Sequence, residues 1–598
     1  MLGQEIELNL SVPEQTMSSL SFAETTPAGL KQWVEDLPMA NIGETSRLLY
    51  QAIIEMNQLI VAPALRFQLL EIVRQPIRYA CQELSKHFLN QAIVLPKKQQ
   101  KIANLAQALQ IHMATGYKVV MSESMPQMSH EKTRKNFACA AHRMMSEYGQ
   151  VLLRANQLYS VAPKNIWYEM HRVFQFTESI DLLKYTIKDT LNAHQEETLI
   201  DQAYKRNLLL SCCRPNQLRQ TDIVAAYDAF EVWSDYVEVG SDYSASAVFV
   251  INMEQDLPPR YRSLLYDTLS DHFYGFDTAE LVSRITSHIG TLSHAKDDGV
   301  VHLVLPNTMS ESLLNHVNQA LGILTKRTFK RVANNGSLNV CAGLSASHFY
   351  TSGEVEFHVQ MLHRDSSQTH SDDNIFMTSA RRQNDAWSDA FDAHTPSTIQ
   401  TTPGNAPITF NRPVNTDGTS YPQYQVPLIN TSPGGYCLQW AGEIPSNIQA
   451  GEVLAIRESE KQPWSIAVIR WIRHARQKGT QIGIELLAPS AKPCGVQLLQ
   501  RTGAPSEYLR GMLLPELTGI GQPATLITPR LPFQSGHKVS IRFNDNDTKC
   551  QLEKRIAATA SFSQFELSQT IDQINTPSAT GNHSKDSEDD FDSLWPTL

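Results

Sequence analysis

The sequence predicts a multidomain α+β protein with an N-terminal α-helical repeat-like domain, a short α/β segment and a C-terminal antiparallel β-barrel with extra strands. Its 598 residues exceed what one hydrophobic core organises, so about two to four domains are expected. Apolar residues recur at helical spacing over residues 28–240. After about residue 420, short apolar runs alternate with turns that contain Gly or Pro, as in a small barrel or sandwich.

The composition is typical of a globular protein and argues against nucleic acid as a partner. A net charge of −10 is unsuited to a general binder of phosphate backbones. The eight cysteines include no Cys-x-x-Cys pair, which predicts reduced, mostly buried thiols. The first residues lack a signal peptide, and no apolar run approaches the roughly 20 residues of a membrane span. We therefore expect a cytoplasmic protein without membrane insertion.

Both ends of the chain are expected to be polar and flexible. Residues 1–27 are rich in Ser, Thr and Glu, although alternating apolar residues could add a strand. Residues 571–598 form an acidic tail that is expected to be disordered, and it either docks on a partner protein or only improves solubility. The alternating residues at the start are Ile6, Leu8, Leu10 and Val12, and the candidate docking residues in the tail are Phe591, Leu594 and Trp595.

The helical domain is predicted over residues 28–240, and protein partners are expected to bind it. Asn41 is a candidate N-cap with Glu44 as its capping-box acid. Pro63 and Pro76 stand where new helices would begin, because proline is tolerated in the first turn. Helix length and pairing resemble a tetratricopeptide-like solenoid, although no consensus repeat can be aligned. Further helices are predicted at roughly 97–120, 129–158, 164–176, 178–192, 196–213 and 220–238.

The segment 241–325 changes to a mixed pattern. Two apolar runs, 248–253 and 300–305, are typical of buried strands. Helical stretches are predicted at about 258–273, 278–292 and 310–325, and no glycine-rich phosphate loop accompanies them. A small α/β unit is therefore expected to lead into the next domain.

The region 326–570 is predicted to be a β-barrel with a polar insertion at about 364–420. A strand at 337–349 follows the Asn334-Asn335-Gly336 turn. After the insertion, strands are predicted at 423–429, 436–440, 452–457, 464–474 and 480–487. A C-terminal extension of the same β unit should contain strands at about 494–500, 524–528, 537–543, 548–554 and 561–567.

Two short motifs in this region could bind a ligand. Residues 430–435, Asn-Thr-Ser-Pro-Gly-Gly, fit the pattern [D/N]-x-S-x-x-G, and Arg327 and Arg331 form an Arg-x-x-x-Arg pair ahead of the first strand. Their order resembles that in the PilZ domain family of cyclic di-GMP receptors, and the runs 464–473 and 482–487 resemble the closing strands of such barrels. The insertion explains the unusual distance between the motifs, since loop-closure entropy grows only slowly with length.

The resemblance implies that cyclic di-GMP is bound by Arg327, Arg331, Asn430, Ser432 and Gly435. Arginine can fork onto phosphate oxygens and stack on guanine, and glycine allows close approach of the main chain. The two motifs, about a hundred residues apart, should then lie side by side in the fold. The alternative is a solvated arginine patch and an ordinary turn on a barrel that binds no nucleotide.

The predicted function is that of a non-catalytic bacterial cyclic di-GMP receptor that couples ligand binding to protein interactions of the helical half. No nucleophile–base pair or metal-ligand set supports an enzyme, a metal or a cofactor other than this ligand. The alternative is a scaffold or adaptor with a degenerate barrel. The family suggests a role in motility or biofilm control. A second basic cluster could reinforce an anionic pocket or only solvate a hairpin tip, and it comprises Arg470, Arg473, His474, Arg476 and Lys478.

Overall fold

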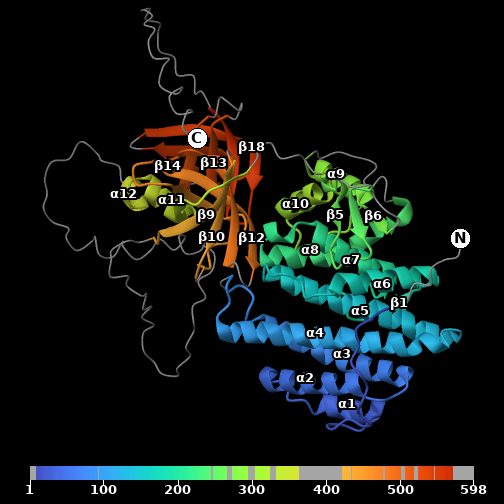
Figure 1. Cartoon of the computed structure of the whole chain (residues 1–598). Helices are drawn as coiled ribbons and strands as arrows, with labels where there is room; N and C mark the ends of the chain where they lie inside the picture. The colour runs from blue at the N-terminus through green and yellow to red at the C-terminus, as the bar shows by residue number, and fades with distance from the viewer. Residues whose placement is uncertain are drawn as a thin grey trace, which may run out of the picture.

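The structure, a computed structural model, contains a stack of helices, a small sheet with two helices, and two β-barrels (Figure 1). Among the residues that the structure describes, no helix is both long and apolar enough to cross a membrane. All eight cysteines are free thiols in the structure, and most of them are buried, as predicted. The structure describes residues 8–91, 93–243, 247–265, 272–293, 303–306, 308–323, 331–361, 421–432, 434–442, 444–475, 479–499, 506–516, 523–543 and 546–569.

The N-terminal half is a stack of mostly antiparallel helices around one apolar core (Figure 1). The predicted N-cap is confirmed, because the Asn41 side chain accepts a hydrogen bond from the Glu44 N–H at 3.2 Å. The helices are α1 (Pro27–Glu35), α2 (Ile42–Gln58), α3 (Pro63–Ser85), α4 (Lys97–Ser124), α5 (Glu131–Gln157), α6 (Ile166–Ser179), α7 (Ile200–Cys212) and α8 (Gln220–Trp233).

Two helix predictions in this half are wrong. Pro76 does not begin a helix but lies inside α3, where the buried neighbours Val73 and Ile77 hold the helix in the core despite the lost hydrogen bond. The predicted helix at 178–192 is also absent, since α6 ends and β1 (Ile187–Lys188) pairs with β2 (Glu197–Thr198). This turn carries Asp189 into the core, where it meets Arg74 at 2.7 Å.

The following segment forms a four-stranded antiparallel sheet in the order β3-β6-β4-β5. The strand predicted at 248–253 is confirmed, as are the helices at 278–292 and 310–325. The predicted helix at 258–273 is wrong, because a short strand and a 3₁₀ turn occupy its described part. The elements are β3 (Glu238–Gly240), β4 (Phe249–Asn252), β5 (Arg260–Tyr261), β6 (Phe273–Asp277), α9 (Ala279–Ser293) and α10 (Glu311–Leu321).

The apolar run at 300–305 forms no strand in its described residues 303–305. Leu303 is buried, and the carbonyl of Val304 accepts a hydrogen bond from the Trp233 indole at 2.8 Å. Leu303 and Leu305 therefore pack on the helical core without forming a strand, and the prediction of a strand is wrong for the described residues.

The first barrel is a closed antiparallel ring in the order β8-β9-β10-β13-β12-β11, in which β11 returns to β8. The short strand β7 extends the ring at β9, end to end with β8. The strands are β7 (Val332–Ala333), β8 (Ser337–Ala342), β9 (Tyr424–Ser432), β10 (Gly435–Trp440), β11 (Val453–Arg457), β12 (Ser465–Ala475) and β13 (Gly479–Ala488).

The strand predicted at 337–349 is only half correct. It ends at Ala342 because Gly343 adopts a positive φ of 96°, and the chain continues as α11 (Leu344–Thr351). His348 of this helix contacts the carbonyl of Cys494 at 3.2 Å, so α11 joins the first barrel to the second. A further short helix, α12 (Phe357–Met361), follows, and the predicted insertion at 364–420 lies outside the described residues.

The C-terminal strands close into a second antiparallel barrel in the order β14-β15-β16-β19-β18-β17. They form a separate barrel with its own core instead of widening the first one. All predicted C-terminal strands are present, and β15 is an additional one. The acidic tail at 571–598 lies outside the described residues. The strands are β14 (Lys492–Leu498), β15 (Leu509–Leu514), β16 (Thr525–Pro529), β17 (Lys538–Phe543), β18 (Asn546–Ala558) and β19 (Phe562–Gln569).

One arginine of the helical half touches both barrels. Arg219, the residue before α8, donates to the carbonyl of Ala450 at 3.1 Å and to the Glu452 carboxylate at 3.2 Å, both in the first barrel. It also donates to the hydroxyl of Ser561, next to β19 of the second barrel, and that hydroxyl donates to Glu452. These contacts form a three-way junction.

Candidate functional site

The predicted ligand motif forms the hairpin between β9 and β10. Ser432 pairs with Gly435 and Asn430 pairs with Cys437, so the turn between them is two residues long. The Ser432 hydroxyl donates to the carbonyl of Gly435 at 3.2 Å, which fixes the turn. The motif residues are thus part of the barrel wall, and their positions are set by strand pairing.

A β-bulge turns the motif to the outer face of the barrel. Leu428 pairs with Leu438, and both side chains are buried in the core. The register then shifts, so that Asn430 pairs with Cys437, which also pairs with Gly483. Directly paired residues share a face of the sheet. In the next row, Ser432 and Gly435 share a face with Glu485, whose side chain is half exposed.

Arg331 lies at the edge of this outer face. Immediately after it, Val332 of β7 pairs with Thr431 of the motif, and Ala333 pairs with Asn430. Burial raises the pKa of the Cys437 thiol, and the charge of the exposed Arg331 lowers it. The expectation that the two motifs lie side by side is confirmed for the part that includes Arg331.

Arg327 lies outside the described residues, and the roles of all five predicted binding residues stay predictions. The structure explains why residue 435 is a glycine. Its φ is +150°, and a Cβ at this position would overlap the carbonyl oxygen of Ile484 on β13. The close approach that was expected for a ligand is therefore made by the backbone of a neighbouring strand.

The sequence interpretation missed an aromatic side chain on the same face. Trp471 of β12 pairs with Gly483, and a Cβ at Gly483 would overlap the indole. The indole therefore lies across β13, in the cross-strand row that contains Asn430 and Cys437. The sequence signal for this residue was a tryptophan opposite a glycine on adjacent strands. That signal can be recognised only when the register of β12 and β13 is known.

The predicted second basic cluster divides in the structure. Arg470 occupies a bulge of β12, and its Nε lies 2.6 Å from a carboxylate oxygen of Glu485. The His474 ring bonds the Thr480 hydroxyl at 2.8 Å. Arg473 is exposed, and Arg476 and Lys478 lie outside the described residues. Arg470 thus borders the outer face at Glu485, and Arg473 lies on the same face, because it follows Trp471 by two positions and pairs with Gln481.

The outer face combines the groups that a cyclic dinucleotide needs. Arg331 and Arg470 can contact phosphates, Asn430 and Ser432 offer hydrogen bonds, and the Trp471 ring offers a stacking surface. No group of His, Cys, Asp and Glu that could hold a metal ion occurs among the described residues. The arrangement suits binding of a planar anionic ligand.

Comparisons with known proteins cover the whole chain. Three family models match: the N-terminal domain of the cyclic-di-GMP receptor FimW at residues 28–243, its middle PilZ domain at 248–493, and the FimW C-terminal beta-barrel domain at 494–570. The cyclic-di-GMP receptor FimW of Pseudomonas aeruginosa is 39% identical over 623 residues, which cover 100% of both chains. No solved structure matches significantly.

Proposed function

Since this chain belongs to the family of the cyclic-di-GMP receptor FimW, we propose that it is a non-catalytic cytoplasmic receptor that binds cyclic di-GMP on the outer face of the first barrel. The observation that carries the proposal is the pairing of β7 with β9, which sets Arg331 beside Asn430 and Ser432. The name of the related receptor supports cyclic di-GMP as the ligand, and the pairing of β7 with β9 supports the outer face as its site.

Each side chain of the face has a role that fits its chemistry. Arg331, together with Arg327, forks onto the phosphates or stacks on a guanine. Asn430 and Ser432 bond a guanine edge or the backbone that seats it. Trp471 supports a base by stacking. Glu485 orients Arg470, because the ion pair holds the guanidinium over β13.

Ligand binding can reach the helical half through β12. Arg470 and Trp471 lie on the proposed ligand face, and three residues later the His474 N–H donates to the carbonyl of Tyr159 at 2.8 Å. A shift of β12 on binding would therefore strain a direct contact with the helical domain. Coupling further requires that the ligand bind one arrangement of the two parts more tightly than another. Protein partners would sense this change at the helical half.

Isothermal titration of cyclic di-GMP into the full chain tests the proposal. The wild type should bind, and Arg327→Ala/Arg331→Ala should weaken binding by at least tenfold, because each charge-assisted hydrogen bond contributes about 1.5–3 kcal/mol. Arg262→Ala is the matched control, since Arg262 is an exposed arginine of the small-sheet segment, which is not part of the first barrel. No binding by the wild type would reject the receptor in favour of a scaffold. Binding unaffected by the double substitution would reject these arginines.

A further inference from the structure

One acidic side chain stands on the proposed ligand face. Glu485 of β13 pairs with Gly435, which pairs with Ser432 of the predicted motif, so the three residues form one row of the outer face. Cyclic di-GMP has two negatively charged phosphates, which a carboxylate repels. The negative charge of Glu485 therefore opposes binding unless the carboxylate makes a favourable contact with another part of the ligand.

Arg470 holds this carboxylate in place but leaves most of it open. The Arg470 Nε lies 2.6 Å from Oε2 of Glu485, and the two side chains are 41% and 49% exposed, respectively. In the part of the chain that the structure describes, no other side chain bonds the carboxylate. A carboxylate has about four acceptor positions, so about three of them are open to a ligand. Arg470 can thus stay bonded while the carboxylate accepts further hydrogen bonds.

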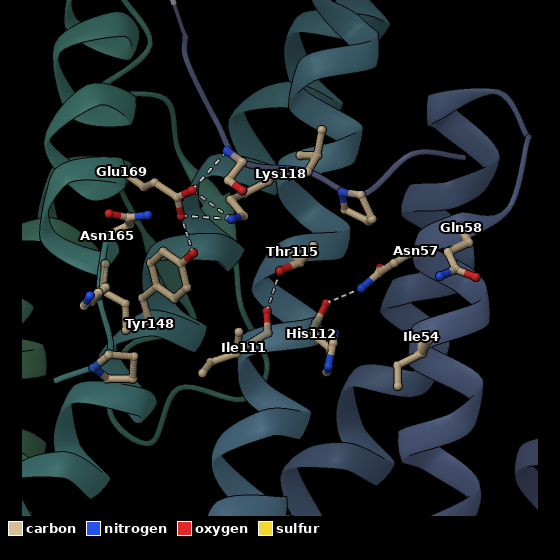
Figure 2. Close-up of a pocket in the computed structure, with 16 residues that line it drawn as sticks. Ile54, Asn57, Gln58, Ile111, His112, Thr115, Lys118, Tyr148, Asn165 and Glu169 are labelled. Carbon is tan, nitrogen blue, oxygen red and sulfur yellow. Dashed lines mark hydrogen bonds and ion pairs between the residues drawn. The ribbon is translucent and has the colours of Figure 1, made fainter. Parts of the chain in front are cut away.

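Glu169 of α6 shows, by contrast, a carboxylate with nothing left for a ligand (Figure 2). It lines a cavity of about 420 Å³ in the helical half. Both of its oxygens lie 2.9 Å from the Lys118 ammonium, the Tyr148 hydroxyl donates to one of them, and the Ser11 N–H donates to the other at 3.1 Å. These contacts use all of its acceptor positions, of which a carboxylate has about four. Glu169 therefore has a structural role, whereas Glu485 is available to a ligand.

Guanine presents two donors that match an open carboxylate. The N1–H and N2–H groups lie side by side on its Watson–Crick edge, and the two oxygens of one carboxylate can accept them. Such charge-assisted hydrogen bonds are roughly twice as strong as those between neutral groups. Adenine has an acceptor at N1 and a single amino donor at N6, so one carboxylate oxygen would face a lone pair. A carboxylate at this edge therefore favours guanine over adenine.

The Trp471 ring places a base within reach of Glu485. The indole lies across Gly483, which precedes Glu485 by two positions on the same face of β13. Residues two positions apart in a strand are separated by about 7 Å, a distance that a glutamate side chain and the edge of a purine span together. A base that stacks on the indole can therefore turn its Watson–Crick edge towards this carboxylate.

We propose that Glu485 selects guanine by accepting N1–H and N2–H from one base of cyclic di-GMP, while Arg470 fixes the carboxylate and contacts a phosphate. The inference rests on the proposed function, because it requires the nucleotide to lie on the outer face of the first barrel. It adds a specificity-determining residue to that site. Glu485 then discriminates against cyclic di-AMP, which has the same phosphates and ribose rings.

Titration calorimetry of cyclic di-GMP and cyclic di-AMP into the full chain tests the proposal, with wild type and Glu485→Gln compared. The wild type should prefer cyclic di-GMP, and Glu485→Gln should reduce that preference at least tenfold. Hydrogen bonds to a charged group correspond to about 10–150-fold in affinity, and the glutamine amide can instead bond N1 and N6 of adenine. Both ligands are titrated into the same preparation, so an inactive fraction of the protein leaves the ratio of affinities unchanged.

Glu311→Gln is the matched control, because Glu311 of α10 also forms an exposed ion pair, with Arg555 of the second barrel. It should keep the preference of the wild type. If Glu485 only orients Arg470 or only repels phosphates, Glu485→Gln changes both affinities by the same factor. That result would overturn the inference and leave the receptor intact. Failure of the wild type to bind either dinucleotide would reject the proposed function and this inference with it.

Discussion

Substitution of Arg219 by alanine should loosen the contact between the helical half and both barrels. The Arg219 and Glu452 side chains are only 12% and 10% exposed, so removal of the arginine leaves a nearly buried carboxylate. Removal of one partner of a buried pair costs about 3–5 kcal/mol. The Ser561 hydroxyl still donates to Glu452, so we expect about 3 kcal/mol, at the lower end of that range.

A double-mutant cycle of Arg219→Ala and Glu452→Ala measures the interaction, with unfolding in urea followed by circular dichroism. We expect a coupling energy of roughly 2 kcal/mol, in the usual range for residues in contact. Arg555→Ala is the matched control, because Arg555 also joins a barrel to the N-terminal part, at Glu311, but these side chains are 32% and 52% exposed. Exposed pairs contribute about 0–1 kcal/mol. A coupling below about 0.5 kcal/mol, or an equal effect of Arg555→Ala, would refute the buried junction.

Three further predictions concern single side chains. Gly483→Ala should destabilise the first barrel by about 2 kcal/mol or more in urea unfolding, because the Trp471 indole must move, whereas Gly290→Ala in α9 has open space and should be neutral or stabilising. Trp471→Ala should weaken cyclic di-GMP binding about 5–150-fold if a base stacks on it, and an unchanged affinity in titration would exclude that role. Burial lowers the pKa of His171 to about 4, so its contribution to stability is complete above about pH 6.5 and is lost as the pH falls towards 4. The slope of unfolding free energy against pH in that window should decrease in His171→Gln and not in His272→Gln, which alters an exposed ring.

The fold class could be predicted because each part has its own periodicity. The helical spacing of residues 28–240 and the short runs after 420 require different elements, and the structure has them in that order. Closure of the second barrel was not predictable, since it depends on the pairing of β14 with β17, about forty residues apart in the chain. The end of the strand at Ala342 depended on the positive φ of Gly343, which the residue type permits but does not demand.

The candidate site was only partly predictable for a similar reason. The order of the two motifs along the chain predicted that Arg331 lies near Asn430. In the structure β7, which directly follows Arg331, pairs with β9, the strand that contains Asn430. Trp471 could not be assigned to the site from the sequence, because bulges in β9 and β12 decide which residues face outwards. The Arg219 junction joins residues that are 231, 233 and 342 positions apart, and no local pattern indicates such a contact.

The placement of β8 has a consequence for the order in which the first barrel folds. Its partners come late in the chain, since the Cys341 thiol contacts the carbonyl of Ala455, 114 residues on, whereas β9–β10 and β12–β13 are local hairpins. Local hairpins form within about 1–10 μs, while contacts between distant residues form more slowly. We therefore expect β8, together with the short β7 that precedes it, to join the barrel last. A nucleotide bound across β7 and β9 would slow the separation of these two strands. The receptor should therefore unfold more slowly when the nucleotide is bound.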